Sequence, residues 1–349
     1  MIYAGNTKLL CHKRKKYHTM NLQERTNAFA SLGDTILTGL NEGNLDTIIA
    51  HACSVNPWFT TEHVRYALKA WGDSLATQEL QRLATTAPQL QHPGTCKTIA
   101  IIMAGNLPLV GMHDWMCVLL AGHKALVKLS SQDDVLLPHL SNMLPTELRD
   151  STTFAHGKLT AFDAVIATGS NNTNRYFDYY FGHYPNIIRH SRNGIAILQG
   201  DESNEELECL CDDIFLHFGL GCRSVTKLFV PRAYNFGALI KASAKYAHFA
   251  DMHLYRSSLD YHKALLLLNS IPFVDGGFWM LQDSAGLAAP VSMVNYEEYD
   301  DIATAELWCR EHSDELQVII RHGFFGQAQH PTLTDFADGV NTLQFLAAL

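Results

Sequence analysis

Short apolar runs follow one another from residue 97 onward, and polar or amphipathic segments separate them. The runs are IAIIMA, ALVKL, AVIAT, GIAIL and KLFV. Ile, Val, Leu and Ala dominate each run with little alternation, which is typical of strands buried on both faces of a sheet. Strands that alternate with helices predict a parallel α/β sheet with crossover helices.

Helical periodicity dominates residues 20–92. The segment that opens at Met20 is amphipathic and places Phe29 on its apolar face. Farther along, Ser203 and Glu206 have the spacing of a capping box, which predicts that a helix begins there and runs toward residue 219. The first part of the chain is therefore expected to be helical, ahead of the α/β segments.

Residues 1–19 lack such periodicity and contain a basic cluster from His12 to Lys16. We expect a disordered extension here; a basic targeting or binding arm is the alternative. The fold is expected to begin near Met20, which is also a candidate translation start.

Composition narrows the class of protein. Hydrophobic residues make up 47% and charged residues 17% of the 349, enough apolar side chains for a sizeable core. A net charge of −9 argues against a nucleic-acid partner, whose affinity comes from neutralising phosphates. The longest apolar stretch, KALLLLNSIPFV, is too short to span a membrane.

The eight cysteines show no C-x-x-C pair and no zinc spacing, and the 18 histidines show no ligand spacing. We therefore expect no metal site. Unpaired cysteines scattered over a long chain are typical of a reducing compartment, which predicts a cytoplasmic protein.

Three predicted strands end in small or polar residues. These ends are AGNLP (104–108), VKLSS (127–131) and TGSNNT (168–173). Ligands of open α/β sheets bind beyond the carboxyl ends of the strands, and a Gly-Ser turn at a helix start can meet phosphate. None of the three is a G-x-G-x-x-G fingerprint, and each taken alone is equally an ordinary turn.

Cys222 is the most specific candidate. It follows a Gly-Leu-Gly turn and precedes Arg223, with Lys227 farther along. Neighbouring cations lower the pKa of a thiol and favour the nucleophilic thiolate. The sequence therefore predicts a reactive cysteine; a buried structural cysteine at a tight turn is the alternative.

The order of these features resembles the aldehyde dehydrogenase superfamily. Asn106, Lys128, Gly169 and Cys222 follow one another at intervals of 22, 41 and 53 residues. The family has an Asn turn, a Lys-Pro-Ser-Glu turn, a Gly-Ser-Thr turn and the catalytic cysteine in that order. Three longer phrases are similar to the LuxC-type acyl-CoA reductases: GSNNTNRYFDYYFG, DIFLHFGLGCRSVTKLFVP and FGQAQHPTLTDFADGVNTLQFL.

The resemblance implies an aldehyde dehydrogenase-like fold. A Rossmann-like nucleotide-binding domain would cover residues 20–200, and an α/β catalytic domain would cover 201–349 and end in an oligomerisation segment. It implies a homo-oligomer, with a further subunit that supplies activated acyl groups as a possible partner.

It also implies roles. Cys222 would attack an acyl-CoA or acyl-protein thioester and become acylated, and NADPH would reduce the acyl-enzyme to the aldehyde. Asn106, with the Cys222 backbone N–H, would form the oxyanion hole. The residues implied to bind the cofactor are Lys128, Ser130, Gly169, Ser170 and Thr173.

Two departures from the family pattern bear on the reaction. Counting back from Cys222 places Ile188 where hydrolytic members carry a glutamate that activates water, and Arg192 where they carry a lysine. An isoleucine cannot be a base, which favours thioester reduction over aldehyde oxidation. Ser131 stands where a glutamate would repel a 2′-phosphate, which favours NADPH. A reductase of acyl phosphates and a non-catalytic acyl-carrying subunit remain alternatives.

Overall fold

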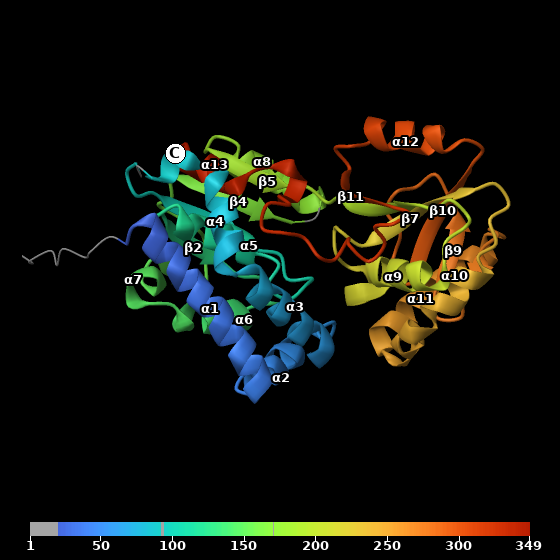
Figure 1. The fold of residues 1–349 in the computed structure, drawn as a ribbon, viewed down its shortest axis with the longest axis horizontal. Coiled ribbons are helices and arrows are strands. Elements are labelled where there is room, and N and C mark those ends of the chain that lie inside the picture. Colours follow the sequence, from blue (N-terminus) through green and yellow to red (C-terminus); the bar gives the residue numbers. More distant parts are fainter. Residues whose placement is uncertain (1–19, 92–93, 170) are drawn as a thin grey trace, which may run out of the picture.

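A computed structural model describes residues 20–91, 94–169 and 171–349. Two mostly parallel sheets lie in two lobes side by side, each covered by helices (Figure 1). The predicted α/β class is confirmed. The predicted extension, residues 1–19, lies outside the described residues. None of the described helices combines the length and the apolar character needed to cross a bilayer.

Four helices form the N-terminal layer of the first lobe. They are α1 (Leu22–Glu42), α2 (Asp46–Val55), α3 (Thr61–Ser74) and α4 (Thr77–Thr85), followed by the 3-10 turn η1 (Pro88–Gln91). Asn21 and Glu24 close a capping box at the start of α1, and Gly43 ends the helix in the left-handed conformation. Thr60 caps α3 by accepting a hydrogen bond from the backbone N–H of His63.

The first sheet has five parallel strands in the order β3-β2-β1-β4-β5. They are β1 (Thr98–Ile102), β2 (Lys124–Lys128), β3 (Thr152–Phe154), β4 (Ala164–Thr168) and β5 (Asn186–Arg189), connected by α5 (Met112–Leu120), α6 (Leu136–Met143), α7 (Thr146–Arg149) and α8 (Asn171–Phe181). The central strands β1 and β4 are almost wholly buried, as their unbroken apolar sequences predict.

The second sheet has the order β11-β6-β7-β10-β9-β8, and β8 alone runs antiparallel to its neighbour. Its strands are β6 (Asn193–Ile197), β7 (Val225–Pro231), β8 (Val274–Asp275), β9 (Met280–Asp283), β10 (Met293–Tyr299) and β11 (Leu316–Arg321). The helical segments of this lobe are α9 (Asn204–Phe215), η2 (Leu216–Gly219), α10 (Gly237–Ala242), η3 (Ser243–Asp251), α11 (His253–Leu268) and α12 (Ile302–Glu311). The predicted capping box of Ser203 and Glu206 opens α9.

The sheets divide the chain earlier than the predicted boundary at residue 200. Strand β6 pairs with β7 and β11, so the second sheet already begins at Asn193. The chain also returns: after η4 (Ala337–Gly339), helix α13 (Thr342–Ala347) packs in the core of the first lobe through Leu343 and Leu346. A contiguous division at residue 200 misses both features because strand pairing and packing link residues far apart in sequence.

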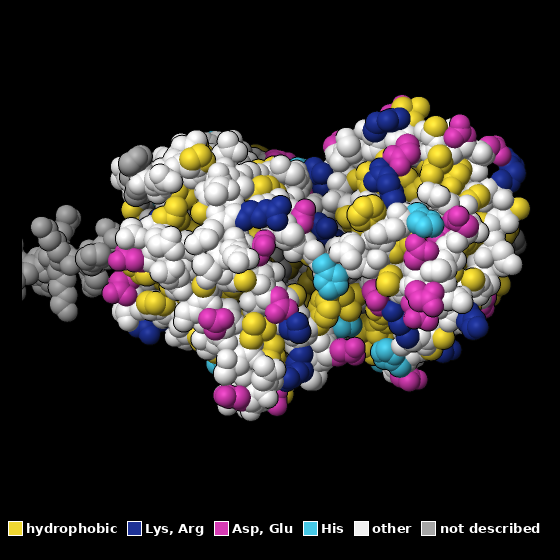
Figure 2. All heavy atoms as spheres, in the orientation of Figure 1, with side chains coloured by type: hydrophobic (Ala, Val, Ile, Leu, Met, Phe, Trp, Pro, Cys, Tyr) yellow, Lys and Arg dark blue, Asp and Glu magenta, His cyan; other side chains and the backbone are white. Residues whose placement is uncertain are grey.

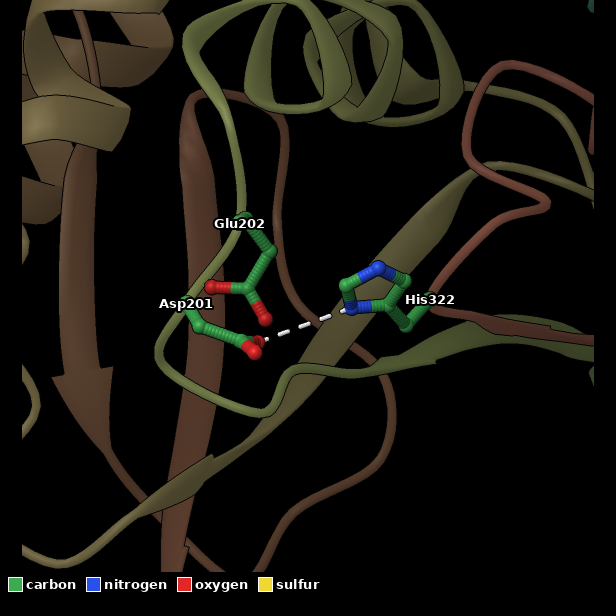
Figure 3. Close-up of side chains that lie close together, drawn as sticks. All are labelled: Asp201, Glu202 and His322. Carbon is green, nitrogen blue, oxygen red and sulfur yellow. Dashed lines mark ion pairs between the residues drawn. The ribbon is translucent and has the colours of Figure 1, made fainter.

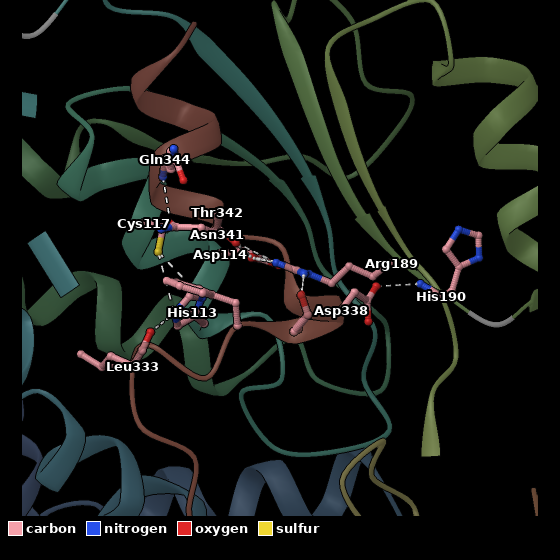
Figure 4. A network of polar contacts seen from close by, with 12 residues as sticks. His113, Asp114, Cys117, Arg189, His190, Leu333, Asp338, Asn341, Thr342 and Gln344 are labelled. Carbon is pink, nitrogen blue, oxygen red and sulfur yellow. Dashed lines mark hydrogen bonds and ion pairs between the residues drawn. The ribbon is translucent and has the colours of Figure 1, made fainter. Parts of the chain in front are cut away.

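A buried ion pair in the first lobe binds both segments that connect the lobes, the one that leaves after β5 and the one that returns before α13. The Arg189 guanidinium, at the end of β5, donates to both carboxylate oxygens of Asp114 in α5, at 3.1 and 2.5 Å. It also donates to the Ala337 carbonyl oxygen and to the Thr342 hydroxyl, each at 2.8 Å (Figure 4). The outgoing linker and the returning segment therefore meet at one cation.

We expect Arg189→Met to lower the free energy of unfolding by about 3–5 kcal/mol, because the Asp114 carboxylate would stay buried without its partner. Urea unfolding of the purified chain measures this. Arg232→Met is the matched control, because Arg232 and its partner Asp300 are both exposed to solvent. Equal effects of the two substitutions would contradict the structural role given to Arg189.

Candidate functional site

The carboxyl ends of three strands meet at one edge of the first sheet. Ile102 at the end of β1 pairs with Lys128 in β2 and with Ala167 in β4. Lys128 is the last residue of β2, and the turns after β1 and β4 carry Asn106 and Gly169. The sheet thus brings three of the predicted segments to a common edge.

Polar contacts hold the loop that carries Asn106. The Asn56 amide donates to the Gly105 carbonyl oxygen at 3.0 Å, and the Leu109 backbone N–H donates to the Asp133 carboxylate at 2.8 Å. Leu109 has a left-handed φ of 59°, which the buried Asp133 bond helps to maintain. Gly105 passes so close to Ser130 that an added Cβ would lie 2.6 Å from its hydroxyl oxygen.

The turn before Cys222 is left-handed at three successive residues. His217, Phe218 and Gly219 have φ values of 53°, 60° and 72°. Two of them carry side chains, so the conformation is strained and must be held by packing. The Phe218 ring is 2% exposed and lies 4.4 Å from the ring of Phe249.

Asn106 reaches this turn from the other lobe. Its side-chain amide donates to the carbonyl oxygen of Leu220 at 3.0 Å. Leu107 packs against Gly221, where an added Cβ would lie 3.2 Å from a Leu107 methyl carbon. The predicted amide and the predicted thiol, 116 residues apart in sequence, therefore lie on adjoining loops.

The surroundings of Cys222 differ in part from the prediction. The residue is exposed to solvent, although protein fills much of the space around its thiol. This burial raises the pKa of the thiol, the Arg223 charge opposes the rise, and the Asp338 carboxylate adds to it. The sequence predicted a lowered thiol pKa, and the structure raises it instead. The neighbouring cation therefore does not by itself produce a thiolate.

Lys227, the second predicted cation, belongs to another site. Its ammonium is buried, bonds the Glu297 carboxylate at 2.7 Å and donates to the Ser284 carbonyl oxygen at 3.0 Å. Side chains point alternately to the two faces of a strand. In β7 the Lys227 side chain points to the face of the second sheet where Glu297 lies. Arg189 lies close enough to Cys222 to lower the thiol pKa, which the sequence did not suggest.

The predicted cofactor residues lie at the same sheet edge. Lys128 is exposed at the end of β2. Gly169 sits so tightly before α8 that an added Cβ would lie 2.9 Å from the Phe177 ring and 3.2 Å from Thr173. The hydroxyl of Ser130 accepts a hydrogen bond from the Gln132 backbone N–H at 3.2 Å. Ser170 lies outside the described residues.

Histidine side chains and apolar surface gather along the waist between the lobes (Figure 2). The rings of His63 in α3 and His217 lie 4.8 Å apart, and the Tyr66 hydroxyl lies 3.3 Å from the His330 ring. Burial lowers the pKa of His63 to about 3 and that of His217 to about 4. Both rings are therefore neutral packing groups near pH 7.

A group of possible cation ligands lies away from the thiol, in the second lobe. Asp201, Glu202 and His322 have ligand atoms within 4.8 Å of one another (Figure 3). His322 approaches Glu206 at 3.1 Å through Nε2, and Glu202 accepts hydrogen bonds from the backbone N–H groups of Gln199 and Gly200. These contacts occupy the carboxylates, so the cluster is explained as part of the turn that precedes α9.

The fold is that of the aldehyde dehydrogenases. A solved structure of aldehyde dehydrogenase 21 from Physcomitrella patens, in complex with the reaction product succinate, matches with a TM-score of 0.64 and 10% identity over 94% of this chain and 84% of that one. An NAD-dependent aldehyde dehydrogenase from Sinorhizobium meliloti matches with a TM-score of 0.64 and 11% identity over 88% and 72%.

A third match is a Mycobacterium tuberculosis aldehyde dehydrogenase complexed with NAD+. Its TM-score is 0.59 and its identity 14%, over 86% of this chain and 78% of that one. No family model matches the chain, and no curated protein matches it. The likeness therefore concerns the fold, and the fold expected from the sequence is confirmed.

We expect acidification to destabilise the protein through His63 and His217. A histidine kept neutral by folding binds fewer protons than it does in the unfolded chain, so stability is lost as pH falls below the ordinary pKa of 6.5. The loss is about 1.4 kcal/mol per pH unit for each such histidine. Urea unfolding between pH 7 and 5 should show a shallower slope for His63→Gln than for the unchanged chain.

His51→Gln is the control for that measurement, because His51 lies exposed on α2. Its slope should match that of the unchanged chain. An identical slope for His63→Gln would show that His63 accepts a proton in the folded state.

Proposed function

We propose that the protein reduces an acyl thioester, an acyl-CoA or acyl-protein, to the aldehyde through an acylated Cys222, with NADPH as the hydride donor. The observation that carries this proposal is the hydrogen bond from the Asn106 amide to Leu220. Leu220 lies in the turn of residues 217–221 that precedes Cys222, called the thiol turn below. A nucleophile and an amide donor held together from two lobes suit a carbonyl that is attacked and develops negative charge. The phrases similar to LuxC-type reductases support the choice of thioester.

Cys222 would attack the carbonyl carbon as the thiolate, and the thiol of the donor would leave. Asn106 has a second amide hydrogen beyond the one given to Leu220, and it would bind the carbonyl oxygen together with the Cys222 backbone N–H. Arg223 favours the thiolate that attacks and the thiolate that is released when the aldehyde leaves.

The residues at the edge of the first sheet fit a dinucleotide. Gly169 precedes α8, and the backbone N–H groups at the start of a helix favour a phosphate. Lys128 stands exposed at the end of β2 on the same sheet edge, and Thr173 lies in the first turn of α8. A bound NADPH would supply the hydride that reduces the acyl-enzyme.

The competing activity, oxidation of an aldehyde to the acid, needs a base that activates water. Ile188, at the position counted for the glutamate, lies in β5 paired with Ala167 and offers no such group. Reduction needs no activated water. We further propose that the chain acts as a homo-oligomer, beside a partner that supplies activated acyl groups.

Cys222→Ala is expected to abolish NADPH oxidation with every acyl-CoA in a panel of chain lengths, followed by absorbance. Cys96→Ala, which removes an exposed cysteine elsewhere, should leave the rate unchanged. Turnover that survives in Cys222→Ala would overturn the assignment of the nucleophile. Turnover with acyl phosphates alone would identify the alternative reductase.

Asn106→Ala should lower kcat by about 10²–10³-fold, because the developing oxyanion loses a donor aimed at it. Steady-state kinetics of the variant with the best acyl-CoA measure this. A loss confined to KM would assign Asn106 to substrate binding and not to the oxyanion.

Ser131→Glu tests the cofactor preference. A carboxylate beside the adenosine ribose would repel a 2′-phosphate, so the ratio of kcat/KM with NADPH to that with NADH should fall about tenfold or more. Asp134→Glu, a substitution at an exposed carboxylate three residues on, is the control. An unchanged ratio in Ser131→Glu would place the ribose elsewhere.

A further inference from the structure

The segment that returns from β11 to α13, residues 322–341, passes beside the thiol turn. A buried carboxylate anchors it there. Asp213 in α9 is 0% exposed, and its two oxygens accept from two backbone N–H groups of the returning segment, Gly326 at 2.6 Å and Ala328 at 2.8 Å. One side chain of α9 thus fixes the path of the returning chain over two residues.

The same segment then holds Arg223. The carbonyl oxygen of Ala328 accepts a hydrogen bond from the Arg223 Nε–H. The Gln329 amide lies 3.3 Å from the Ser224 hydroxyl, which in turn accepts from the Gly221 backbone N–H at 3.3 Å. The residues on both sides of Cys222 are therefore tied to a segment whose position depends on Asp213.

Arg223 matters because its charge acts on the thiol. The charged groups that face Cys222 are Arg223, Asp338 of η4 and Arg189 of β5, and Arg223 gives the largest favourable contribution to the thiolate among the three. Asp335, in the returning segment, also faces Arg223. A guanidinium that moved away from the thiol would leave the rise caused by burial less opposed.

We propose that Asp213 is a positioning residue: by holding the Ala328 peptide, it keeps the Arg223 guanidinium beside the Cys222 thiol. This inference rests on the proposed function of Cys222 as the nucleophile. Sequence gives no sign of it, since Asp212 and Asp213 are adjacent acids in one helix.

The geometry requires a carboxylate at this position. Each Asp213 oxygen meets an N–H donor, so an amide of the same shape could accept from only one and would turn its own NH₂ group toward the other. Burial raises the pKa of Asp213 to about 6, against the lowering effect of these two hydrogen bonds and of Arg223, while Asp212 adds to the rise. At pH 7 and above the carboxylate form therefore predominates.

The test is the pH dependence of Cys222 alkylation by iodoacetamide in the full chain. Peptide mass spectrometry follows Cys222, with exposed Cys96 as the internal reference. Asp213→Asn should raise the apparent pKa of the thiol and slow its alkylation at pH 7.5 about three- to tenfold, because the thiolate fraction falls tenfold per pKa unit. Alkylation of Cys96 should not change.

Asp212→Asn is the matched control. Asp212 is the neighbouring carboxylate of the same helix, but it pairs with Lys245 and Tyr246 and not with the returning segment. In Asp212→Asn, the pH dependence of Cys222 alkylation should equal that of the unchanged chain. Arg223→Gln should raise the thiol pKa at least as much as Asp213→Asn, and adding Asp213→Asn to Arg223→Gln should add nothing.

Two outcomes would overturn the proposal. One is a folded Asp213→Asn chain with an unchanged Cys222 titration, which leaves Asp213 a purely structural role. The other is an unchanged titration in Arg223→Gln, which is decisive even where Asp213→Asn does not fold. Alkylation needs no turnover, so failure of thioester reduction in the NADPH assay would be seen separately.

Discussion

The hydrogen bond from the Asn106 amide to the Leu220 carbonyl oxygen joins two parts of the chain that no local sequence relation connects. One partner stands in a loop after β1 of the first sheet and the other in the turn before β7 of the second. Everything that the site can do depends on the two lobes holding these loops in register. Because one amide hydrogen is already bound to the turn, the second is directed by it, and the donor is preorganised before a substrate arrives.

Each loop is held by interactions outside the site. The Asn106 loop is fixed by Asn56 and Asp133, and the thiol turn by the packing of Phe218. The crossings between the lobes are fixed by Arg189 and Asp114 (Figure 4). The left-handed residues before Cys222 cost conformational energy. They persist because the buried rings of His63, Phe249 and Tyr255, on α3, η3 and α11, pack around Phe218. The strain is thus supported by tertiary contacts, those of α3 coming from the first lobe, and not by the turn's own sequence.

Much of the fold followed from the sequence. Unbroken apolar runs predicted buried parallel strands, and the capping box at Ser203 predicted the start of α9 to the residue. The strand ends predicted that Asn106, Lys128 and Gly169 would share a sheet edge. The division between the two sheets falls before residue 200, because β6 looks like any apolar strand and only its pairing assigns it to the second sheet.

The electrostatics of the site were less accessible. A cation next to Cys222 in sequence suggested a lowered thiol pKa, but the density of protein around the thiol outweighs it. Lys227 was expected at the thiol and instead pairs with Glu297 on β10. Arg189 and Asp338 lie far from Cys222 in sequence, and Asp213 acts through Ala328, 115 residues away. Their effect on the thiol therefore depends on tertiary packing, which neither periodicity nor spacing encodes.

The central claim is that Cys222 carries the acyl group, and intact-protein mass spectrometry tests it most directly. The chain is mixed with an acyl-CoA in the absence of NADPH and its intact mass is measured. One portion is then digested to map the adduct, and NADPH is added to the undigested remainder. We predict one acyl adduct, located at Cys222, that disappears when NADPH is supplied. NADPH oxidation that proceeds while Cys222 stays unmodified would contradict the account.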